Sequence, residues 1–330
     1  MSKDQVEHVL PPQRRGRGCL RWLGRIVALV LGAMLVGAIY ESIAEAADAR
    51  AYPPPGQLVD VGGYRLHIHC TGTGSPTVVI DAGLSDWSTM WGFVQPEVAK
   101  TTQVCTYDRA GMGWSEAGPL PRNARQFAKE LHALLQQARL PGPYVLVGHS
   151  LGGLTVHVFA HDYPSEVAGL VLIESMSPGQ FTPSPTDTPS QSDPQSHAFS
   201  ILPVLARVGV VRLILKPLGF ILYKPPDEKA YYARFVRPQS LQTFADEAQA
   251  MPESGAQAGA VKTIGDLPLI VLSRGLDKNQ NWQAWQAELH QLSSHGQQLI
   301  ADKSGHNIEN DQPDAAVAAI VKMIEQLRNR

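Results

Sequence analysis

Residues 144–153, Tyr-Val-Leu-Val-Gly-His-Ser-Leu-Gly-Gly, decide the fold class of this chain. The first four are apolar and predict a short buried strand, and the mostly apolar residues 154–160 that follow predict a helix. A Gly-x-Ser-x-Gly pattern between a strand and a helix is typical of a nucleophile elbow, which holds a serine hydroxyl clear of the backbone. Gly148 and Gly152 fit this interpretation, because side chains there would collide where strand and helix meet. The alternative is an ordinary glycine-rich turn in which Ser150 only caps the helix.

Length and composition favour one large globular domain with an insertion, or at most two domains. The chain has 330 residues, a formal net charge of -2 and 44% hydrophobic residues. The near-neutral charge gives no indication of nucleic-acid binding. Cys19, Cys70 and Cys105 are too few for a disulfide-dense scaffold and show no Cys-x-x-Cys metal spacing. The sequence does not indicate an oligomeric state.

The N-terminal segment predicts a membrane anchor. Arginines are concentrated between residues 14 and 25, and residues 26–40 carry no charge. We expect a basic cytoplasmic tail over residues 1–19, a transmembrane signal anchor over 20–42, and a Pro-rich linker over 43–56. The catalytic domain would then lie outside the cytoplasm. The alternative is a cleaved signal peptide, cut near Ala44-Glu45-Ala46, with a secreted or periplasmic domain.

The rest of the chain alternates strands with helices, which implies a mostly parallel sheet covered on both faces. The expected strands lie at residues 58–61, 64–70, 77–81, 103–108, 144–147, 167–173, 267–272 and 297–301. About ninety residues without this alternation separate the sixth strand from the seventh. We therefore expect a core formed by residues 57–176 and 265–330, with a lid inserted over 177–264.

Four segments together resemble the α/β-hydrolase fold over residues 57–327. They are Asp-Ala-Gly-Leu at 81–84, Tyr-Asp-Arg-Ala-Gly-Met-Gly-Trp-Ser at 107–115, the elbow, and Ser-Gly-His at 304–306. The resemblance implies an α/β fold with a mostly parallel eight-stranded sheet, helices on both faces and an inserted helical lid. Here one N-terminal transmembrane helix would precede that fold. The chain most resembles membrane-anchored or exported bacterial serine hydrolases of this superfamily.

The resemblance also implies the catalytic residues. Ser150 is the expected nucleophile, and a serine hydroxyl needs a base to remove its proton. His306 follows the last strand, where this fold places that base. Two carboxylates compete to orient the histidine: Asp277, which we favour because Pro268 precedes it by the family's usual nine residues, and Glu174, at the end of the sixth strand.

Two backbone amides are expected to form the oxyanion hole. One belongs to Leu151, directly after the nucleophile, and the other, by resemblance, to Leu84 in the loop after the third strand. The family's usual His-Gly-x segment is Ala82-Gly83-Leu84 here, and Asp81 stands just before the position of the usual histidine, which is a departure from the family. The residues 109–113 are not a dinucleotide loop, because Glu116 occupies the place of its third glycine, and we expect no cofactor.

Two further observations concern histidines and cysteines. His67 and His69 share one face of a strand, but a structural metal site needs four suitably placed ligands, so we expect no metal. In the resembled fold the second and fourth strands are antiparallel neighbours. Cys70 and Cys105 could therefore face each other, as a disulfide in an exported domain or as two buried thiols.

The expected activity is hydrolysis of a carboxylic ester (EC 3.1.1), a small molecule with a hydrophobic group. A serine at the elbow argues against dehalogenase or soluble epoxide hydrolase chemistry, because those relatives use an aspartate there. Apolar lid residues between 199 and 220 suit a hydrophobic substrate, although they could equally be lid core. The alternatives are an amidase, lactonase or small-peptide hydrolase with the same triad, and a non-enzymatic ligand-binding protein on this scaffold.

Overall fold

The computed structural model describes residues 16–181, 194–218, 225–276 and 279–330. Its centre is one eight-stranded sheet with the order β1-β2-β4-β3-β5-β6-β7-β8. The strands are β1 (Gln57–Asp60), β2 (Arg65–Thr71), β3 (Thr77–Asp81), β4 (Val104–Tyr107), β5 (Tyr144–His149), β6 (Val167–Ile173), β7 (Leu269–Arg274) and β8 (Gly296–Ala301).

The sheet is mostly parallel, as predicted. Only β2 runs against its neighbours, pairing antiparallel with β1 and β4, while β4, β3, β5, β6, β7 and β8 run in one direction. The central strands β3 and β5 are buried at every position, because aliphatic side chains project from both faces. Such strands require helices on each side of the sheet.

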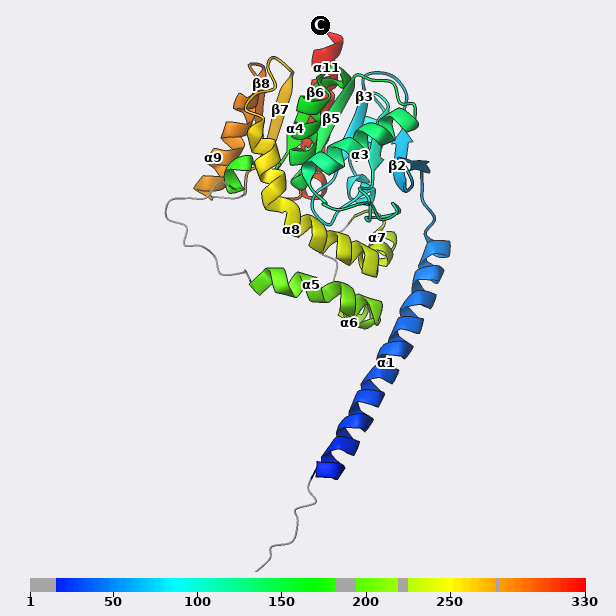
Figure 1. Ribbon diagram of the computed structural model, residues 1–330. Coiled ribbons are helices and arrows are strands. Elements are labelled where there is room, and N and C mark those ends of the chain that lie inside the picture. The colour runs from blue at the N-terminus through cyan, green and yellow to red at the C-terminus, as the bar shows by residue number, and fades with distance from the viewer. Residues whose placement is uncertain (1–15, 182–193, 219–224, 277–278) are drawn as a thin grey trace, which may run out of the picture.

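The helices form two layers around the sheet (Figure 1). On one face α3 (Ala124–Gln137) and α4 (Leu151–Asp162) pack against residues such as Leu146 and Leu170. On the other face α2 (Gln95–Val98) and α11 (Pro313–Arg328) pack against Val145, Val171 and their neighbours. Two further helices, α9 (Gln280–Leu289) and α10 (Ile308–Asp311), flank β8 in the sequence.

A helical insertion separates β6 from β7. Its helices are α5 (Pro194–Arg207), α6 (Val210–Leu218), α7 (Glu228–Phe235) and α8 (Pro238–Ala260). In Figure 1, α8 lies across one end of the domain, and α5 and α6 form a further layer below it. Ala206 and Val211 of the outer layer pack with Val236 and Leu241. The predicted α/β-hydrolase architecture with an inserted helical region is therefore confirmed.

The N-terminal helix α1 (Gly16–Ala51) is long, apolar and projects away from the domain (Figure 1). Its residues Arg21–Ala51 are long and apolar enough to cross a membrane. The helix continues to Ala51, so it includes most of the stretch that we expected as a linker.

The two cysteines in the sheet are bonded to each other. Cys70 of β2 and Cys105 of β4 are register partners, their Cα atoms are 4.0 Å apart, and they form a disulfide. Of the two outcomes left open by the sequence, the structure shows the disulfide.

Candidate active site

Ser150 occupies the sharp turn between β5 and α4. Its φ of +50° and ψ of -117° lie outside the regions that L-residues normally adopt. The turn is tight because the flanking glycines allow close approach. A Cβ on Gly148 would lie 2.6 Å from the carbonyl oxygen of Gly152, and a Cβ on Gly152 would lie 2.5 Å from that of Asp81. The strand, turn and helix predicted around the serine are all present.

His306 lies beside Ser150, although 156 residues separate them. It follows β8 and precedes α10, and its Nε2 is 3.1 Å from the Ser150 Oγ. Ser150 is only 3% exposed, whereas the His306 side chain is 35% exposed. The Trp282 ring meets the His306 ring edge to face, at 5.9 Å between centroids. The pair has the distance that a serine and its general base require.

A buried carboxylate faces the other nitrogen of the imidazole. Glu174 follows β6 with a φ of +45°, and its Oε1 is 3.7 Å from the Nδ1 of His306. The Glu174 side chain is fully buried, and its Oε2 accepts a 2.7 Å hydrogen bond from the backbone N–H of Arg274. Asp277, the other candidate acid, lies outside the described residues.

Arg274 is a functional-site residue that the sequence reasoning missed. Its Nη1 is 3.1 Å from Oε1 of Glu174 and 3.4 Å from Nδ1 of His306. Its guanidinium also stacks over the Trp282 ring, 4.4 Å from the centroid. The positive charge beside Glu174 offsets part of the cost of burying that carboxylate. The only sequence signal was its position at the end of β7, where strand ends meet the site.

The two amides expected in the oxyanion hole lie in suitable local structures. Leu151 is the first residue of α4, so its N–H has no acceptor within the helix. Leu84 follows Gly83, whose carbonyl oxygen accepts a 2.6 Å hydrogen bond from Nη2 of Arg109. The C=O of Gly83 and the N–H of Leu84 belong to one trans peptide and point in opposite directions. Because Arg109 binds the Gly83 carbonyl, the Leu84 N–H points away from Arg109.

Arg109 is itself held by two buried carboxylates. Its Nη1 donates to Asp81 at 2.7 Å and to the carbonyl of Ala82 at 2.6 Å. Its Nε and Nη2 donate to the two oxygens of Glu247, both at 2.9 Å. Glu247 belongs to α8, so the insertion helps to fix the loop after β3. Spacing along the sequence could not show this, because 138 residues separate Arg109 from Glu247.

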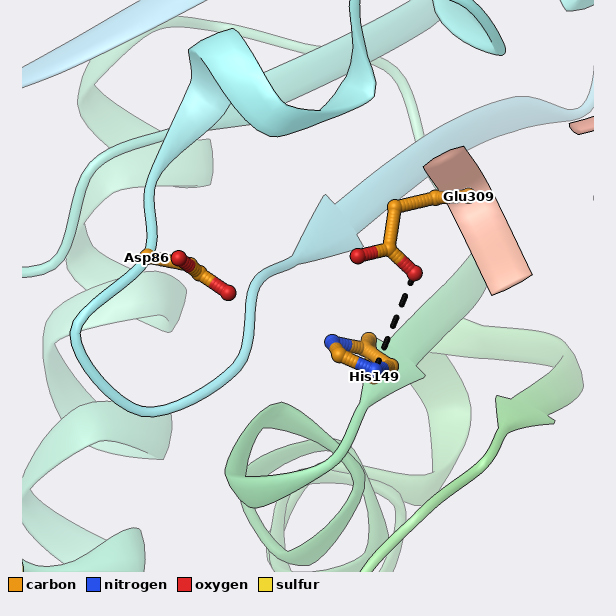
Figure 2. A group of neighbouring side chains, drawn as sticks. All are labelled: Asp86, His149 and Glu309. Atoms are coloured by element: carbon orange, nitrogen blue, oxygen red, sulfur yellow. Dashed lines mark ion pairs between the residues drawn. The ribbon is translucent and has the colours of Figure 1, made fainter. Parts of the chain in front are cut away.

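Three further ionisable side chains lie close together, as Figure 2 shows. Asp86, His149 and Glu309 are all buried, and one ligand-type atom of each lies within 4.8 Å of the others. The Nε2 of His149 is 3.0 Å from the main-chain carbonyl oxygen of His306 and 3.7 Å from Oε2 of Glu309. Because a carbonyl oxygen can only accept, His149 carries its proton on Nε2 and donates it, which ties the elbow to the His306 loop.

Burial keeps this cluster largely uncharged. Desolvation lowers the pKa of His149 to about 3, raises the pKa of Asp86 to about 7 and raises the pKa of Glu309 well above its usual range. Within the described part of the chain it is the only such group with a metal-compatible arrangement. Protonated carboxyls are poor cation ligands, so these buried groups fit a structural network better than a metal site.

The histidines noted on β2 have a different role. His67 is fully buried, with Nδ1 3.0 Å from Oδ2 of Asp108, and its Nε2 accepts from the N–H of Gly56. Both ring nitrogens of His67 are therefore engaged within the protein, which leaves no lone pair for a metal.

Residues 76–308 match the family model described as the alpha/beta hydrolase fold. The chain belongs to this family. The α/β-hydrolase match covers more than half of the chain and includes Ser150, His306 and the insertion. The family and fold predicted from the sequence are thus confirmed.

Curated relatives of this α/β hydrolase differ greatly in length. YqjL of Bacillus subtilis (strain 168) is 25% identical over 259 residues, which cover 76% of this chain and 85% of YqjL. A vacuolar membrane protein of Saccharomyces cerevisiae (strain YJM789) is 31% identical over 130 residues, 34% of this chain but only 20% of the yeast protein. Neither name states a reaction.

Solved structures with the same fold include enzymes of several reaction types. An esterase from Thermogutta terrifontis has a TM-score of 0.62 at 21% identity, covering 82% of this chain and 98% of the esterase. The epoxide hydrolase CorEH has a TM-score of 0.64 at 19% identity, with the same coverages. An enol-lactonase from Burkholderia xenovorans LB400 has a TM-score of 0.60 at 19% identity, covering 82% of this chain and all of the lactonase. At these identities the likeness shows the fold alone.

Proposed function

We propose that this α/β hydrolase cleaves carboxylic esters through Ser150, His306 and an acidic residue, by way of an acyl-enzyme. The observation that carries the proposal is the 3.1 Å approach of His306 Nε2 to Ser150 Oγ at a strained turn. Epoxide hydrolase and dehalogenase chemistry on this fold needs a carboxylate nucleophile, and the elbow carries a serine. Amides, lactones and small peptides remain alternative substrates, because the same triad can cleave them.

The mechanism follows from the positions of these groups. His306 takes the Ser150 proton while the Oγ attacks the substrate carbonyl carbon, and the resulting oxyanion accepts hydrogen bonds from the amides of Leu84 and Leu151. His306 then gives the proton to the leaving alcohol, which departs and leaves an acyl-serine. Water, deprotonated by His306, attacks this ester, and release of the acid restores Ser150.

We propose Glu174 as the acid that orients His306. Its Oε1 is fully buried, pairs with Nη1 of Arg274 at 3.1 Å and lies 3.7 Å from Nδ1 of His306. Catalytic hydrogen bonds are often long in a free enzyme and shorten when substrate binds. Asp277 stays as the alternative, and paired substitutions distinguish the two.

We also propose that α1 anchors the enzyme in a membrane, with the domain outside the cytoplasm. Only 6% of the residues in the most apolar stretch of α1 are buried, a basic flank precedes that stretch, and the Cys70–Cys105 disulfide suits an oxidising compartment. Arg212 of α6 binds Glu41 and Asp48 of α1. Cleavage near Ala46 would remove Glu41 and leave Arg212 with half of its partners, which favours an uncleaved anchor over a signal peptide.

A fluorophosphonate probe tests the serine-hydrolase proposal. The purified full chain should react with the probe and hydrolyse p-nitrophenyl esters, and a series of acyl chain lengths would define the acyl preference. Ser150→Ala should lose labelling and reduce kcat by on the order of 10⁶-fold. A folded wild-type protein that does not label would contradict the proposal. Ester turnover that survives Ser150→Ala would assign the activity to another site, and binding without turnover would favour a ligand-binding protein.

A further inference from the structure

The helix pair α5–α6 is apolar on two opposite sides. Its inner side packs on the rest of the insertion through Ala206 and Val211, which are 1% and 7% exposed. Its outer side carries five large apolar side chains that are 36–58% exposed: Ile201, Val204, Leu205, Leu213 and Ile214. A helix facing water normally has a polar outer side, so this outer face indicates contact with another apolar phase.

The end of the apolar part of α1 lies against this pair. Gly37 approaches the backbone carbonyl of Val208 so closely that a Cβ would overlap it, and Tyr40 lies against Gly209. Both α1 residues belong to the uncharged run 26–40. At 1.5 Å per residue that run covers roughly 22 Å, which is less than the ~30 Å hydrocarbon core of a bilayer. If α1 spans a membrane, the turn between α5 and α6 lies at the depth of the leaflet surface.

The acidic side chains of α1 at this level form ion pairs with α6. Glu41, in the next turn of α1, is 2% exposed and binds Arg212 through both carboxylate oxygens at 2.8–3.1 Å. Arg212 also binds Asp48 at 2.6 Å. A lone carboxylate at the edge of the hydrocarbon would be costly, whereas a hydrogen-bonded ion pair is tolerated. The α6 helix is therefore fastened to α1 where the apolar run ends.

We propose that the outer face of α5–α6 is embedded in the membrane leaflet that α1 enters. This inference rests on the proposed membrane anchor. The occupant is the lipid leaflet, because the exposed apolar surface of α1 continues directly onto this face across the Gly37–Val208 contact. Helices α7 and α8 connect this face to the active site. Tyr231 of α7 donates a hydrogen bond to Asp86, and Glu247 of α8 accepts one from Arg109. On this proposal, the insertion borders the active site on the side that faces the membrane. Amphiphilic esters partition into that membrane.

Fluorescence of a single NBD label tests the proposal on the full chain. In a Cys19→Ser background, Leu213→Cys or Ile214→Cys is labelled, and the protein is reconstituted into phosphatidylcholine–phosphatidylglycerol vesicles. The emission should shift to shorter wavelength and be quenched by lipids that carry a nitroxide near the headgroup. Ile300→Cys is the matched negative control, because Ile300 is 58% exposed on β8, remote in the sequence from α1 and the insertion. Its label should not be quenched.

A label at Leu29→Cys separates the two proposals. Leu29 is 75% exposed on α1, so a true anchor places its label among nitroxides located deep in the acyl chains. Quenching at residue 29 without quenching at 213 or 214 would overturn the proposal that α5–α6 is embedded in lipid. The proposal that α1 is a membrane anchor would still hold. An environment at 213 that is apolar but not reached by lipid quenchers would indicate a protein neighbour and would also overturn it. Absence of quenching at residue 29 would remove the anchor and this inference together.

Discussion

Ser150 and Glu174 both adopt a positive φ, of +50° and +45°, although neither is a glycine. They stand directly after the neighbouring parallel strands β5 and β6. Such conformations cost of order 1–3 kcal/mol each and persist only where the surrounding structure enforces them. Both side chains lie near the His306 imidazole, at Nε2 and Nδ1 respectively. The strain therefore coincides with the two groups that the proposed mechanism needs beside the histidine.

Exchange of one carboxylate at a time identifies the triad acid. Glu174→Gln should lower kcat by about 10⁴-fold, because a neutral amide neither holds the productive tautomer of His306 nor stabilises its charged form. Asp277→Asn is the matched change and should leave most of the activity. The measurement is kcat on a p-nitrophenyl ester, with folding checked by circular dichroism. A large loss in Asp277→Asn with an active Glu174→Gln would reverse the assignment.

The buried His149 makes stability depend on pH. Its folded pKa of about 3 is below the ordinary value of 6.5, so between these values the unfolded chain binds more protons than the folded one. The contribution of His149 is therefore fully present above about pH 6.5 and is lost as the pH falls toward 3. His149→Gln should show a smaller decline in the free energy of unfolding over this interval, measured by urea titration. His161→Gln, at a half-exposed histidine of α4, is the control, and equal slopes in all three proteins would contradict the prediction.

The loop after β3 is positioned by two elements at once. Arg109 follows β4 and donates to the carbonyls of Ala82 and Gly83, while Glu247 of α8 holds the guanidinium from the other side. All of these groups are buried, so no water can replace a lost contact easily. The orientation of the Leu84 amide is thus coupled to the seating of the insertion.

Arg109→Lys tests this coupling. An ammonium cannot bind both carbonyls and Glu247 in one plane, so the loop should shift and kcat should fall by about 10²-fold with little change in KM. Arg122→Lys is the matched control, because Arg122 forms an equally buried two-bond pair with Glu130. Both variants should show a similar decrease in the free energy of unfolding. Equal losses of kcat in the two would mean that Arg109 acts only on folding.

At the scale of the molecule, the disulfide joins the antiparallel part of the sheet to its parallel part. Cys70 and Cys105 close a loop of 35 residues between β2 and β4. A loop of this length restricts the unfolded chain enough to stabilise the fold by about 3–4 kcal/mol.

Removal of the disulfide should therefore lower Tm by roughly 5–8 °C. The variant is Cys70→Ala/Cys105→Ala, compared with Cys19→Ala as a control outside the sheet. Thermal unfolding of the full chain in detergent, with and without reductant, measures the effect. Reductant should lower the Tm of the wild type and of Cys19→Ala but not that of the double variant. If the Tm of the wild type does not change when its disulfide is fully reduced, the prediction is wrong.

The sequence by itself determined the features that depend on local patterns. The local patterns predicted all eight strands: residues 64–70 alternate, and the central strands are apolar throughout because both faces of the sheet are covered there. The elbow could be predicted because its glycines lie within two residues of Ser150 and act on the same turn. His306 was placed by family order, since a loop after the last strand reaches the elbow in this topology.

Only the tertiary structure decided which distant side chains meet. Glu174 and Asp277 both follow strands next to the site, so the sequence left two candidates; the Glu174 carboxylate lies 3.7 Å from His306, and the paired substitutions test which acid orients the histidine. The pairs Arg109–Glu247 and Glu41–Arg212 depend on how the insertion packs on the core and on α1. Local periodicity indicates which face of a helix is buried, but not which element covers it. That choice is made by packing across more than a hundred residues of chain.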